Sequence, residues 1–447
     1  MTLTSESLAQ AAERMLGAAG GGLSGLARLS GGANMESWSF DWGGAGYVLR
    51  RAPSAARMVG RPYSHAVEAA LVRAAHAAGV RAPEVVGELI EADGLGTGYV
   101  MRRVEAEVAP ARILADHPAN LIDDIARELA RIHSLRPGTS PLLDRVPTMD
   151  TAAALAELDA RFQTYGGDRP IIALAIRWCE DHLPAPCDPR LVHGDFRMGN
   201  LMVDGAGLAA VLDWEIAHWG DPHDDLAYGC MTVWRFGRID RPAYGIADLE
   251  RFFAAYEAQS GRAVDRARFR FWLVYRTLWW ALGCLGMGEL WRTGADRNLE
   301  RAVIGRRTSE NELDLLLLLE EDAPQAERRP IRLEPSPPAR RQGEPSAVEM
   351  LEAVREWIDA DVKPRAEGRD RFMAAVAMNA LGMLVREASH PVQVYDAGLS
   401  ADLRSGRVTL ATPGVLARLR AAALAKLEND VPKYAALAQA RAAWLEP

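Results

Sequence analysis

Three side chains with oxygen donors stand at the ends of short apolar runs in the middle of the chain. Asp195 and Asp213 each follow such a run, and Asn200 directly precedes another. Runs of this kind are typical of strands, so the three side chains are expected on loops between strands. Carboxylate and amide oxygens are ligands that Mg²⁺ prefers, beside phosphate oxygens. A carboxylate five residues before an amide is also the spacing used in phosphoryl transfer, where the Asp takes a hydroxyl proton and the Asn holds metal.

The part of the chain before residue 105 reads as an antiparallel sheet with helices. A leading helix is expected over Ser5 to Ala18 and a second over Ser64 to Ala78, while Gly43-Gly44 predicts a hairpin turn. The expected strands cover residues 26–29, 35–42, 46–51, 85–90 and 98–104.

A glycine-containing loop, Leu29 to Glu36, lies between the first two expected strands. Gly31 and Gly32 would let backbone N–H groups approach phosphates without a Cβ in the way, and Asn34 belongs to the same loop. A Gly-Gly pair alone is more often an ordinary turn. The loop is therefore informative only beside the polar set around Asp195.

From residue 119 onward the apolar period becomes helical. Helices are expected over residues 150–165, 170–183, 224–236, 246–260, 265–290 and 296–320. Residues 326–345 contain five prolines and five arginines, which is typical of a linker. Beyond it, helical periodicity covers residues 346–360, 369–389, 413–429 and 431–444, and Ser346 to Glu349 fits a capping box.

The segments His193-Gly-Asp-Phe-Arg-Met-Gly-Asn200 and Asp213-Trp-Glu215 resemble the aminoglycoside phosphotransferase family of small-molecule kinases. Together with Gly220 to Tyr228, these segments are most similar in sequence to phosphotransferase domains related to those fused to some acyl-CoA dehydrogenases. The resemblance implies an α+β, bilobal protein-kinase-like fold with an antiparallel N-lobe and a mainly helical C-lobe, followed by an all-helical domain. The N-lobe, C-lobe, linker and helical domain would cover residues 1–105, 106–322, 323–345 and 346–447.

By the same resemblance, Asp195 is the base that orients and deprotonates an acceptor hydroxyl. Arg197 would neutralise charge on the transferring phosphoryl group, and Asn200 and Asp213 would hold Mg²⁺. The donor would be ATP or GTP, and the acceptor a small molecule with a hydroxyl group.

Arg50 falls where kinases carry the lysine that touches the α- and β-phosphates, with Glu68 on the next helix as its partner. Arginine is a departure, because its planar fork is not interchangeable with an ammonium group. The alternative is that both are merely exposed charges, which are common. Met101 would lie behind the adenine, with the backbone of Arg102 and Val104 bonding its edge.

Three further residues in or near these segments are interpreted separately from the catalytic set. His193 is interpreted as a structural hydrogen-bonding residue and not as the base. Asp225 is expected to brace the catalytic loop by accepting backbone N–H bonds. For Glu215, contact with a second metal ion and a capping role both stay open.

Composition limits the classes of protein. Lys and Arg number 52 against 60 Asp and Glu, a net charge of −8, which argues against a nucleic-acid binder. The four cysteines show neither metal spacing nor a disulfide framework. The segment from Met1 to Leu16 carries acids without a hydrophobic core region, and the apolar run from Thr277 to Gly288 is too short to span a bilayer. We therefore expect a soluble cytoplasmic protein without a membrane partner, and a homodimer stays open.

Aromatic and arginine residues recur at helical spacing late in the chain, which we interpret first as a buried helix. The competing interpretation is that part of this stripe borders the acceptor pocket, where arginine and tryptophan would suit an anionic or apolar acceptor. Poor activity on polycationic, kanamycin-like substrates is therefore expected, and a hydroxy acid or hydroxyacyl-CoA is the first acceptor class to test. The residues are Trp272, Tyr275, Arg276, Trp279 and Trp280, with Trp234, Arg235, Trp291 and Arg292 in neighbouring segments.

Two rival functions remain at this point. One is a nucleotide-binding pseudokinase or scaffold, in which Arg50 has lost the phosphate grip. The other is a protein kinase, although no Ala-Pro-Glu segment follows Asp213 and little room is left there for an activation loop.

Overall fold

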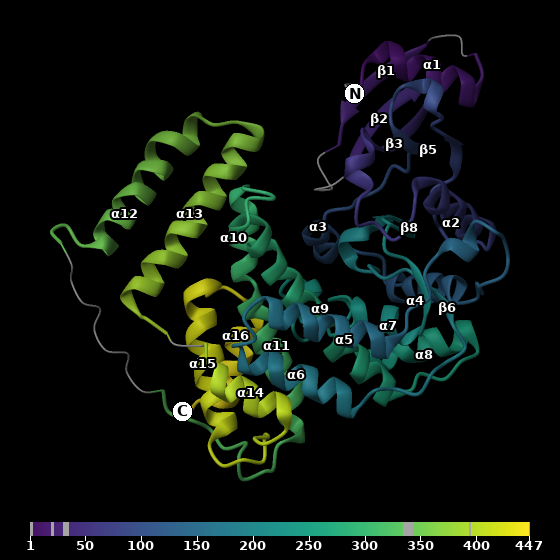
Figure 1. The fold of residues 1–447 in the computed structure, drawn as a ribbon. Coiled ribbons are helices and arrows are strands. Elements are labelled where there is room, and N and C mark those ends of the chain that lie inside the picture. Colours follow the sequence, from purple (N-terminus) through teal and green to yellow (C-terminus); the bar gives the residue numbers. More distant parts are fainter. Residues whose placement is uncertain (1–2, 19–21, 30–34, 334–342, 393–394, 447) are drawn as a thin grey trace. The chain divides into compact units, whose positions relative to one another are not determined.

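The structure is a computed structural model that describes residues 3–18, 22–29, 35–333, 343–392 and 395–446 (Figure 1). Contacts between Cα atoms divide the chain into two compact units. The first comprises residues 1–150, 185–230 and 234–269, and the second residues 151–184, 231–233 and 270–447. The fold class is α+β, as predicted, and the proposed domain limits stay a prediction.

A five-stranded antiparallel sheet forms the start of the first unit, in the order β1-β2-β3-β5-β4. Gly43 and Gly44 join β2 and β3, and both have the positive φ values that a tight hairpin turn requires. The strands are β1 (Leu23–Arg28), β2 (Glu36–Trp42), β3 (Ala45–Ala52), β4 (Val85–Glu88) and β5 (Thr97–Arg102).

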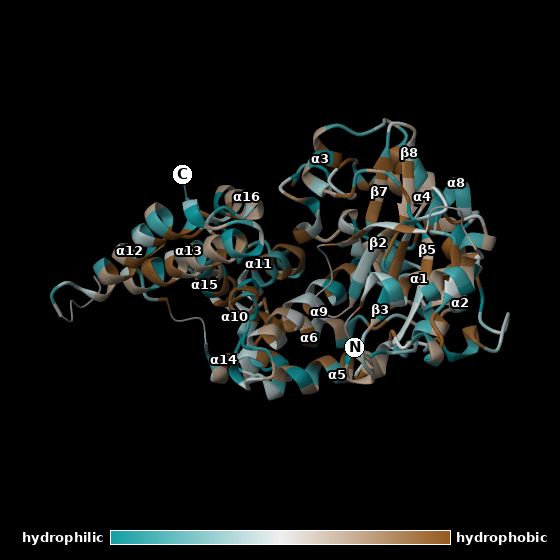
Figure 2. Ribbon diagram, turned by 90° about the horizontal axis from the view of Figure 1, so that it is seen from above, coloured by the Kyte–Doolittle hydropathy of each residue, from teal (hydrophilic) through white to brown (hydrophobic). Residues whose placement is uncertain are grey.

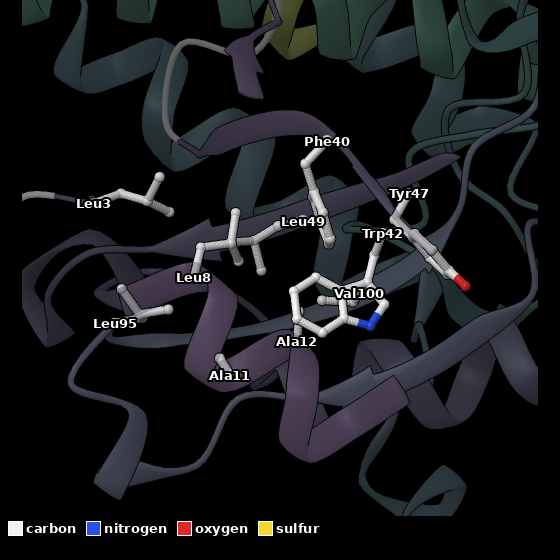
Figure 3. Packing of buried hydrophobic residues seen from close by; sticks show 10 residues of the cluster. All are labelled: Leu3, Leu8, Ala11, Ala12, Phe40, Trp42, Tyr47, Leu49, Leu95 and Val100. Carbon is white, nitrogen blue, oxygen red and sulfur yellow. The ribbon is translucent and has the colours of Figure 1, made fainter. Parts of the chain in front are cut away.

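One face of this sheet is covered by α1 (Ser5–Leu16), whose first turn is closed by a capping box at Thr4. Leu8 and Ala12 of the helix pack in one buried cluster with Phe40 of the sheet (Figure 3). The other members of the cluster are Leu3, Ala11, Trp42, Tyr47, Leu49, Leu95 and Val100. Burial of these apolar side chains fixes the sheet that carries Arg50.

The rest of the first unit surrounds two short strand pairs, in which β6 pairs with β9 and β7 with β8. The apolar residues of β7 and β8 are coloured brown in Figure 2. The strands are β6 (Arg190–Val192), β7 (Leu201–Asp204), β8 (Gly207–Val211) and β9 (His218–Gly220), and the helices are α2 (His65–Ala77), α3 (Pro110–Ala115), α4 (Leu121–Ile132), α7 (His223–Tyr228) and α8 (Leu249–Ser260). The single helix predicted over 224–236 is wrong, because α7 ends before Gly229 and a separate 3₁₀ turn covers Thr232–Arg235.

The second unit is helical. Its elements are α5 (Thr151–Thr164), α6 (Pro170–Asp181), α9 (Arg266–Arg292, whose first turn belongs to the first unit), α10 (Leu299–Arg306), α11 (Thr308–Leu319), α12 (Ala347–Trp357), α13 (Gly368–Ser389), α14 (Ala397–Ser405), α15 (Val415–Asp430) and α16 (Ala435–Trp444). The single helix predicted over 296–320 is interrupted at Arg307. The capping box at Ser346 is confirmed. Within the predicted linker, Ile331 exchanges backbone hydrogen bonds with Trp444 and Glu446.

None of the helices in the described ranges combines the length and the apolar character needed to cross a membrane.

Candidate active site

The loop that carries Asp195 starts where β6 ends, and Asp225 of α7 holds its backbone by hydrogen bonds. The carboxylate of Asp225 accepts the backbone N–H of His193 at 2.6 Å and that of Gly194 at 2.8 Å. Gly194 has φ +83°, so the turn needs a residue without a Cβ, which would meet the Ile216 carbonyl at 2.8 Å. The bracing role predicted for Asp225 is confirmed by these bonds.

Asp225 is fully buried, and its environment keeps it charged. Burial alone would raise the pKa of Asp225, but the hydrogen bond from His133 and the backbone N–H of His193 hold it below its usual value. His133 lies 3.3 Å from the carboxylate and bonds Tyr256 at 2.8 Å with its other ring nitrogen. The brace is therefore a preorganised anion inside the protein.

Asp195 itself is held by two neighbours from the same loop. Arg197 donates from Nε to one carboxylate oxygen at 2.8 Å, and Asn200 donates from Nδ2 to the other at 2.6 Å. The Asn200 amide nitrogen also bonds the Asp195 carbonyl at 2.9 Å. Because its nitrogen is used this way, the Oδ1 of Asn200 is the atom left to bind a cation.

Asp213 lies at the same end of the β7–β8 hairpin as Asn200. The backbone N–H of Leu212, its neighbour in sequence, donates to the Asn200 carbonyl at 2.8 Å. Asp213 has φ +66°, a left-handed conformation that is uncommon outside glycine and recurs at functional sites. The structure therefore places Asp213 one residue beyond a backbone contact with Asn200, and their joint role as metal ligands stays a prediction.

Arg50 of β3 makes the ion pair with Glu68 of α2 that the sequence predicted, with Nε 3.0 Å from Oε1. Its Nη2 also donates to Asp213 Oδ1 at 2.9 Å and to Glu215. Burial alone would lower the pKa of Arg50, but the charges of Glu68 and Asp213 raise it. Arg50 is therefore a fixed cation beside a predicted metal ligand, and not an exposed charge.

A second arginine that the sequence interpretation missed joins this cluster. Arg61, just before α2, forms an ion pair with Glu215 and lies 3.9 Å from Glu68. Burial and the neighbouring Asp213 raise the pKa of Glu215, and the two arginines oppose that rise. No local spacing links Arg61 to Glu215, so no motif could have identified the pair.

His193 has the structural role that was predicted. Its Nε2 contacts the Leu212 carbonyl at 3.1 Å, and its Nδ1 accepts the backbone N–H of Asp195 at 3.2 Å. Burial lowers the pKa of His193, so the neutral ring joins the two segments that carry Asp195 and Asp213.

Trp234 stands next to the loop that carries Asp195, with the Arg197 guanidinium 4.4 Å from its ring centroid. In the second unit, Trp272, Tyr275 and Arg276 are buried, as expected for a core helix, whereas Trp279 and Trp280 are half-buried. Of this aromatic stripe, Trp234 thus lies near Asp195, whereas the buried residues of α9 stabilise that helix.

The predicted nucleotide contacts are described only in part. Gly31, Gly32 and Asn34 lie outside the described residues. Met101 of β5 is half-buried opposite Val48, and Val104 follows the end of this strand. The backbone N–H of Arg102 donates to the Glu84 carbonyl at 2.9 Å, and contact of this backbone with a base stays a prediction.

The sequence profile of the phosphotransferase enzyme family matches residues 25–272 of the chain. The chain belongs to this family. A solved structure of a Ralstonia eutropha protein described as an aminoglycoside phosphotransferase matches with a TM-score of 0.56 and 21% identity, over 72% of this chain and 99% of the other. That likeness shows a shared fold.

Three curated proteins are similar to this chain in sequence. Acyl-CoA dehydrogenase family member 10 of Mus musculus is 27% identical over 238 residues, 47% of this chain and 21% of that protein. Family member 11 of Gallus gallus is 30% identical over 221 residues, 45% of this chain and 27% of that protein. Hygromycin-B 4-O-kinase of Escherichia coli is 27% identical over 301 residues, 63% of this chain and 78% of that protein. The chain thus spans about a fifth to just over a quarter of the two dehydrogenase relatives.

Proposed function

We propose that this phosphotransferase moves the γ-phosphoryl group of ATP to the hydroxyl group of a small molecule, with Mg²⁺ as cofactor. One observation carries the proposal: Asp195 is fixed by Arg197 and Asn200 on a loop braced by buried Asp225. Family membership supports the reaction class. The Asp195 side chain keeps about 15% of its surface exposed, so an acceptor can reach it.

In the proposed reaction, Asp195 orients the acceptor hydroxyl and takes its proton. The acceptor oxygen bonds to the γ-phosphorus while the bond from that phosphorus to the β–γ bridging oxygen breaks, so ADP leaves. Such a loose transition state depends more on positioning than on a strong base. Arg197 neutralises charge that develops on the phosphoryl oxygens.

The chemistry of the side chains fits a magnesium ion, which when bound would neutralise phosphate charge. The free Oδ1 of Asn200 and the carboxylate of Asp213 would hold the magnesium ion. Among the residues that the structure describes, no three His, Cys, Asp or Glu side chains form a metal site by themselves. Mg²⁺ in such enzymes commonly takes only one or two protein carboxylates beside phosphate oxygens and water.

Arg50 takes the phosphate-binding role of the usual lysine in this proposal. It is anchored through Nε to Glu68, while its Nη2 reaches Asp213 and Glu215. Nucleotide phosphates would replace these two carboxylates as partners of the guanidinium fork, which matches phosphate geometry. This retained cation is the observation that counts against the pseudokinase alternative.

For the acceptor, we propose a hydroxy acid or hydroxyacyl-CoA. The support is the similarity to two acyl-CoA dehydrogenase family members, together with Arg197 and Trp234 beside Asp195, which suit an anionic or apolar group. The similarity to hygromycin-B 4-O-kinase favours the broader class of hydroxyl acceptors.

Calorimetry with Mg-ATP and Mg-GTP, followed by ADP or GDP release with an acceptor panel, tests the proposal. The panel contains hydroxy acids, hydroxyacyl-CoAs, simple alcohols, kanamycin and hygromycin B, and mass spectrometry identifies the phosphorylated product. Turnover stimulated by a hydroxy acid or hydroxyacyl-CoA supports the full proposal. Turnover only with kanamycin overturns the acceptor class, and nucleotide binding without stimulated turnover favours the scaffold.

A further inference from the structure

Few residues of the α12–α13 hairpin (residues 347–389) are buried. None of the 11 residues of α12, all of which the structure describes, is buried. In α13, which has 22 residues, only Ala374, Gly382 and Met383 are buried. Figure 1 shows α12 beside α13, and α13 also packs against α10 and α15.

The exposed side of α12 is apolar. Met350, Val354 and Trp357 follow the i, i+4, i+7 spacing of one helix side, and they are 52%, 42% and 58% exposed. Half-buried Leu351 marks a neighbouring side, and α13 adds the half-exposed Phe372. Figure 2 shows brown segments along both helices. Exposed apolar side chains on one side of a helix are typical of an interaction site.

The hairpin has the size of a protein interface. At 1.5 Å per residue, α12 and α13 are about 16 and 33 Å long, and side by side they present a face on the order of 500 Å² in projection. Accessible area exceeds projected area, so the face approaches the ~800 Å² per partner of a standard interface. A second hairpin of the same length would cover it as in a four-helix bundle.

The charges of the two helices complement each other. α12 carries three glutamates against one arginine, a net charge of −2, and α13 carries three arginines against two acids, a net charge of +1. Within the described ranges, Glu352 and Glu356 of α12 and Arg371 of α13 form no ion pair with each other or with other residues. Arg369 and Glu387 of α13 already pair with Glu300 and Arg306 of the same chain. A two-fold contact places α12 of each copy along α13 of the other, so the unpaired glutamates of one copy meet Arg371 of its partner.

We propose that the α12–α13 hairpin is a self-association surface, which pairs two copies of this chain through a four-helix contact. Trp357, Met350 and Phe372 form its apolar centre, and Glu356 and Arg371 lie at its charged rim. The proposal is independent of the phosphotransfer chemistry, because none of these residues belongs to the candidate active site.

Analytical ultracentrifugation of the full chain over a range of concentrations tests the proposal. The expected species has twice the 48.7 kDa of one chain. Met350→Glu with Trp357→Glu should weaken the association by at least tenfold, because buried aromatic anchors carry most of the energy of an interface. Leu142→Glu, at a residue of the first unit that is 40% exposed, is the matched control and should change nothing.

Charge reversal separates self-association from general stickiness. Glu356→Arg alone and Arg371→Glu alone should each weaken the dimer, and the two changes in one chain should restore it. Circular dichroism verifies that each variant keeps its helix content. A chain that stays at 48.7 kDa at every concentration, or a dimer that Trp357→Glu leaves intact, overturns the proposal.

Discussion

The loop that carries Asp195 and the α12–α13 hairpin differ in how far the rest of the chain contacts their side chains. Around Asp195, both carboxylate oxygens are bonded by Arg197 and Asn200, and a buried carboxylate, Asp225, fixes the backbone. In the hairpin, the helices are well formed but Trp357 and Met350 remain uncovered. The loop is thus complete within one chain, whereas the hairpin needs a surface from outside. Side chains fixed in advance suit chemistry, and an uncovered apolar side suits binding.

Replacement of the predicted metal ligand Asp213 should lower activity more than the replacements of Asp225 and Arg50 described below. Asp213→Ala should lower kcat/KM by about 10³-fold, because charge on the transferring group is no longer compensated. Calorimetry should also show weaker binding of Mg-ATP, with a smaller change for nucleotide without magnesium. Asp240→Ala, at an exposed carboxylate, is the control. Equal magnesium dependence in Asp213→Ala and the parent chain would contradict the assignment.

Asp225→Asn tests whether the buried brace matters for the chemistry. The variant keeps the volume but loses the charge that accepts two backbone N–H bonds, so activity should fall by roughly 10- to 100-fold, with a lower Tm. Asp361→Asn, in the connection between α12 and α13, should change neither quantity. A Tm change without loss of kcat would reduce Asp225 to a purely structural residue.

The sequence predicted the parts of the site that have a local pattern. Asp195, Asn200 and Asp213 stand at fixed spacing, and the resemblance to kinases matched Arg50 with Glu68. Other features depend on the three-dimensional arrangement. Arg61 meets Glu215 only because the chain folds back, and the carbonyl of Glu84 takes the N–H of Arg102 across strand neighbours.

The ends of the helices also divide into those that a local sequence pattern predicts and those that it does not. The cap at Ser346 is set by four consecutive residues and was predicted, whereas the interruption at Arg307 lies within a continuous helical pattern and was not. Periodicity also predicted the helices of the hairpin. It could not show that Trp357 stays exposed, since an apolar stripe looks the same whether or not another element covers it.

Arg50→Lys should have an intermediate effect. The lysine keeps the charge but loses the fork that reaches Glu68 with one nitrogen and phosphates with another, so the Kd for Mg-ATP should rise roughly tenfold. Arg73→Lys, at an exposed arginine of α2, is the matched control. Unchanged nucleotide affinity in Arg50→Lys would show that the fork does not bind phosphate.

A further prediction concerns the pH dependence of stability and not activity. Burial, with Arg50 nearby, lowers the pKa of His65 to about 4. Between pH 6.5 and 4 the unfolded chain binds a proton at this histidine that the folded chain does not, so stability falls as the pH drops through this range, by up to ~3 kcal/mol. His65→Gln should make the fall of Tm with decreasing pH shallower by a few degrees. The exposed His390→Gln should not, and identical slopes in all three proteins would contradict the shift.

The central claim is that Asp195 makes the hydroxyl of a bound acceptor reactive toward a nucleoside triphosphate. Asp195→Asn preserves the size of the side chain, so Mg-ATP should bind with nearly unchanged affinity in calorimetry. Acceptor-stimulated ADP release should nevertheless fall by 10²- to 10⁴-fold, the range expected for loss of a positioned base. Undiminished ADP release from Asp195→Asn in the presence of the acceptor would contradict the account.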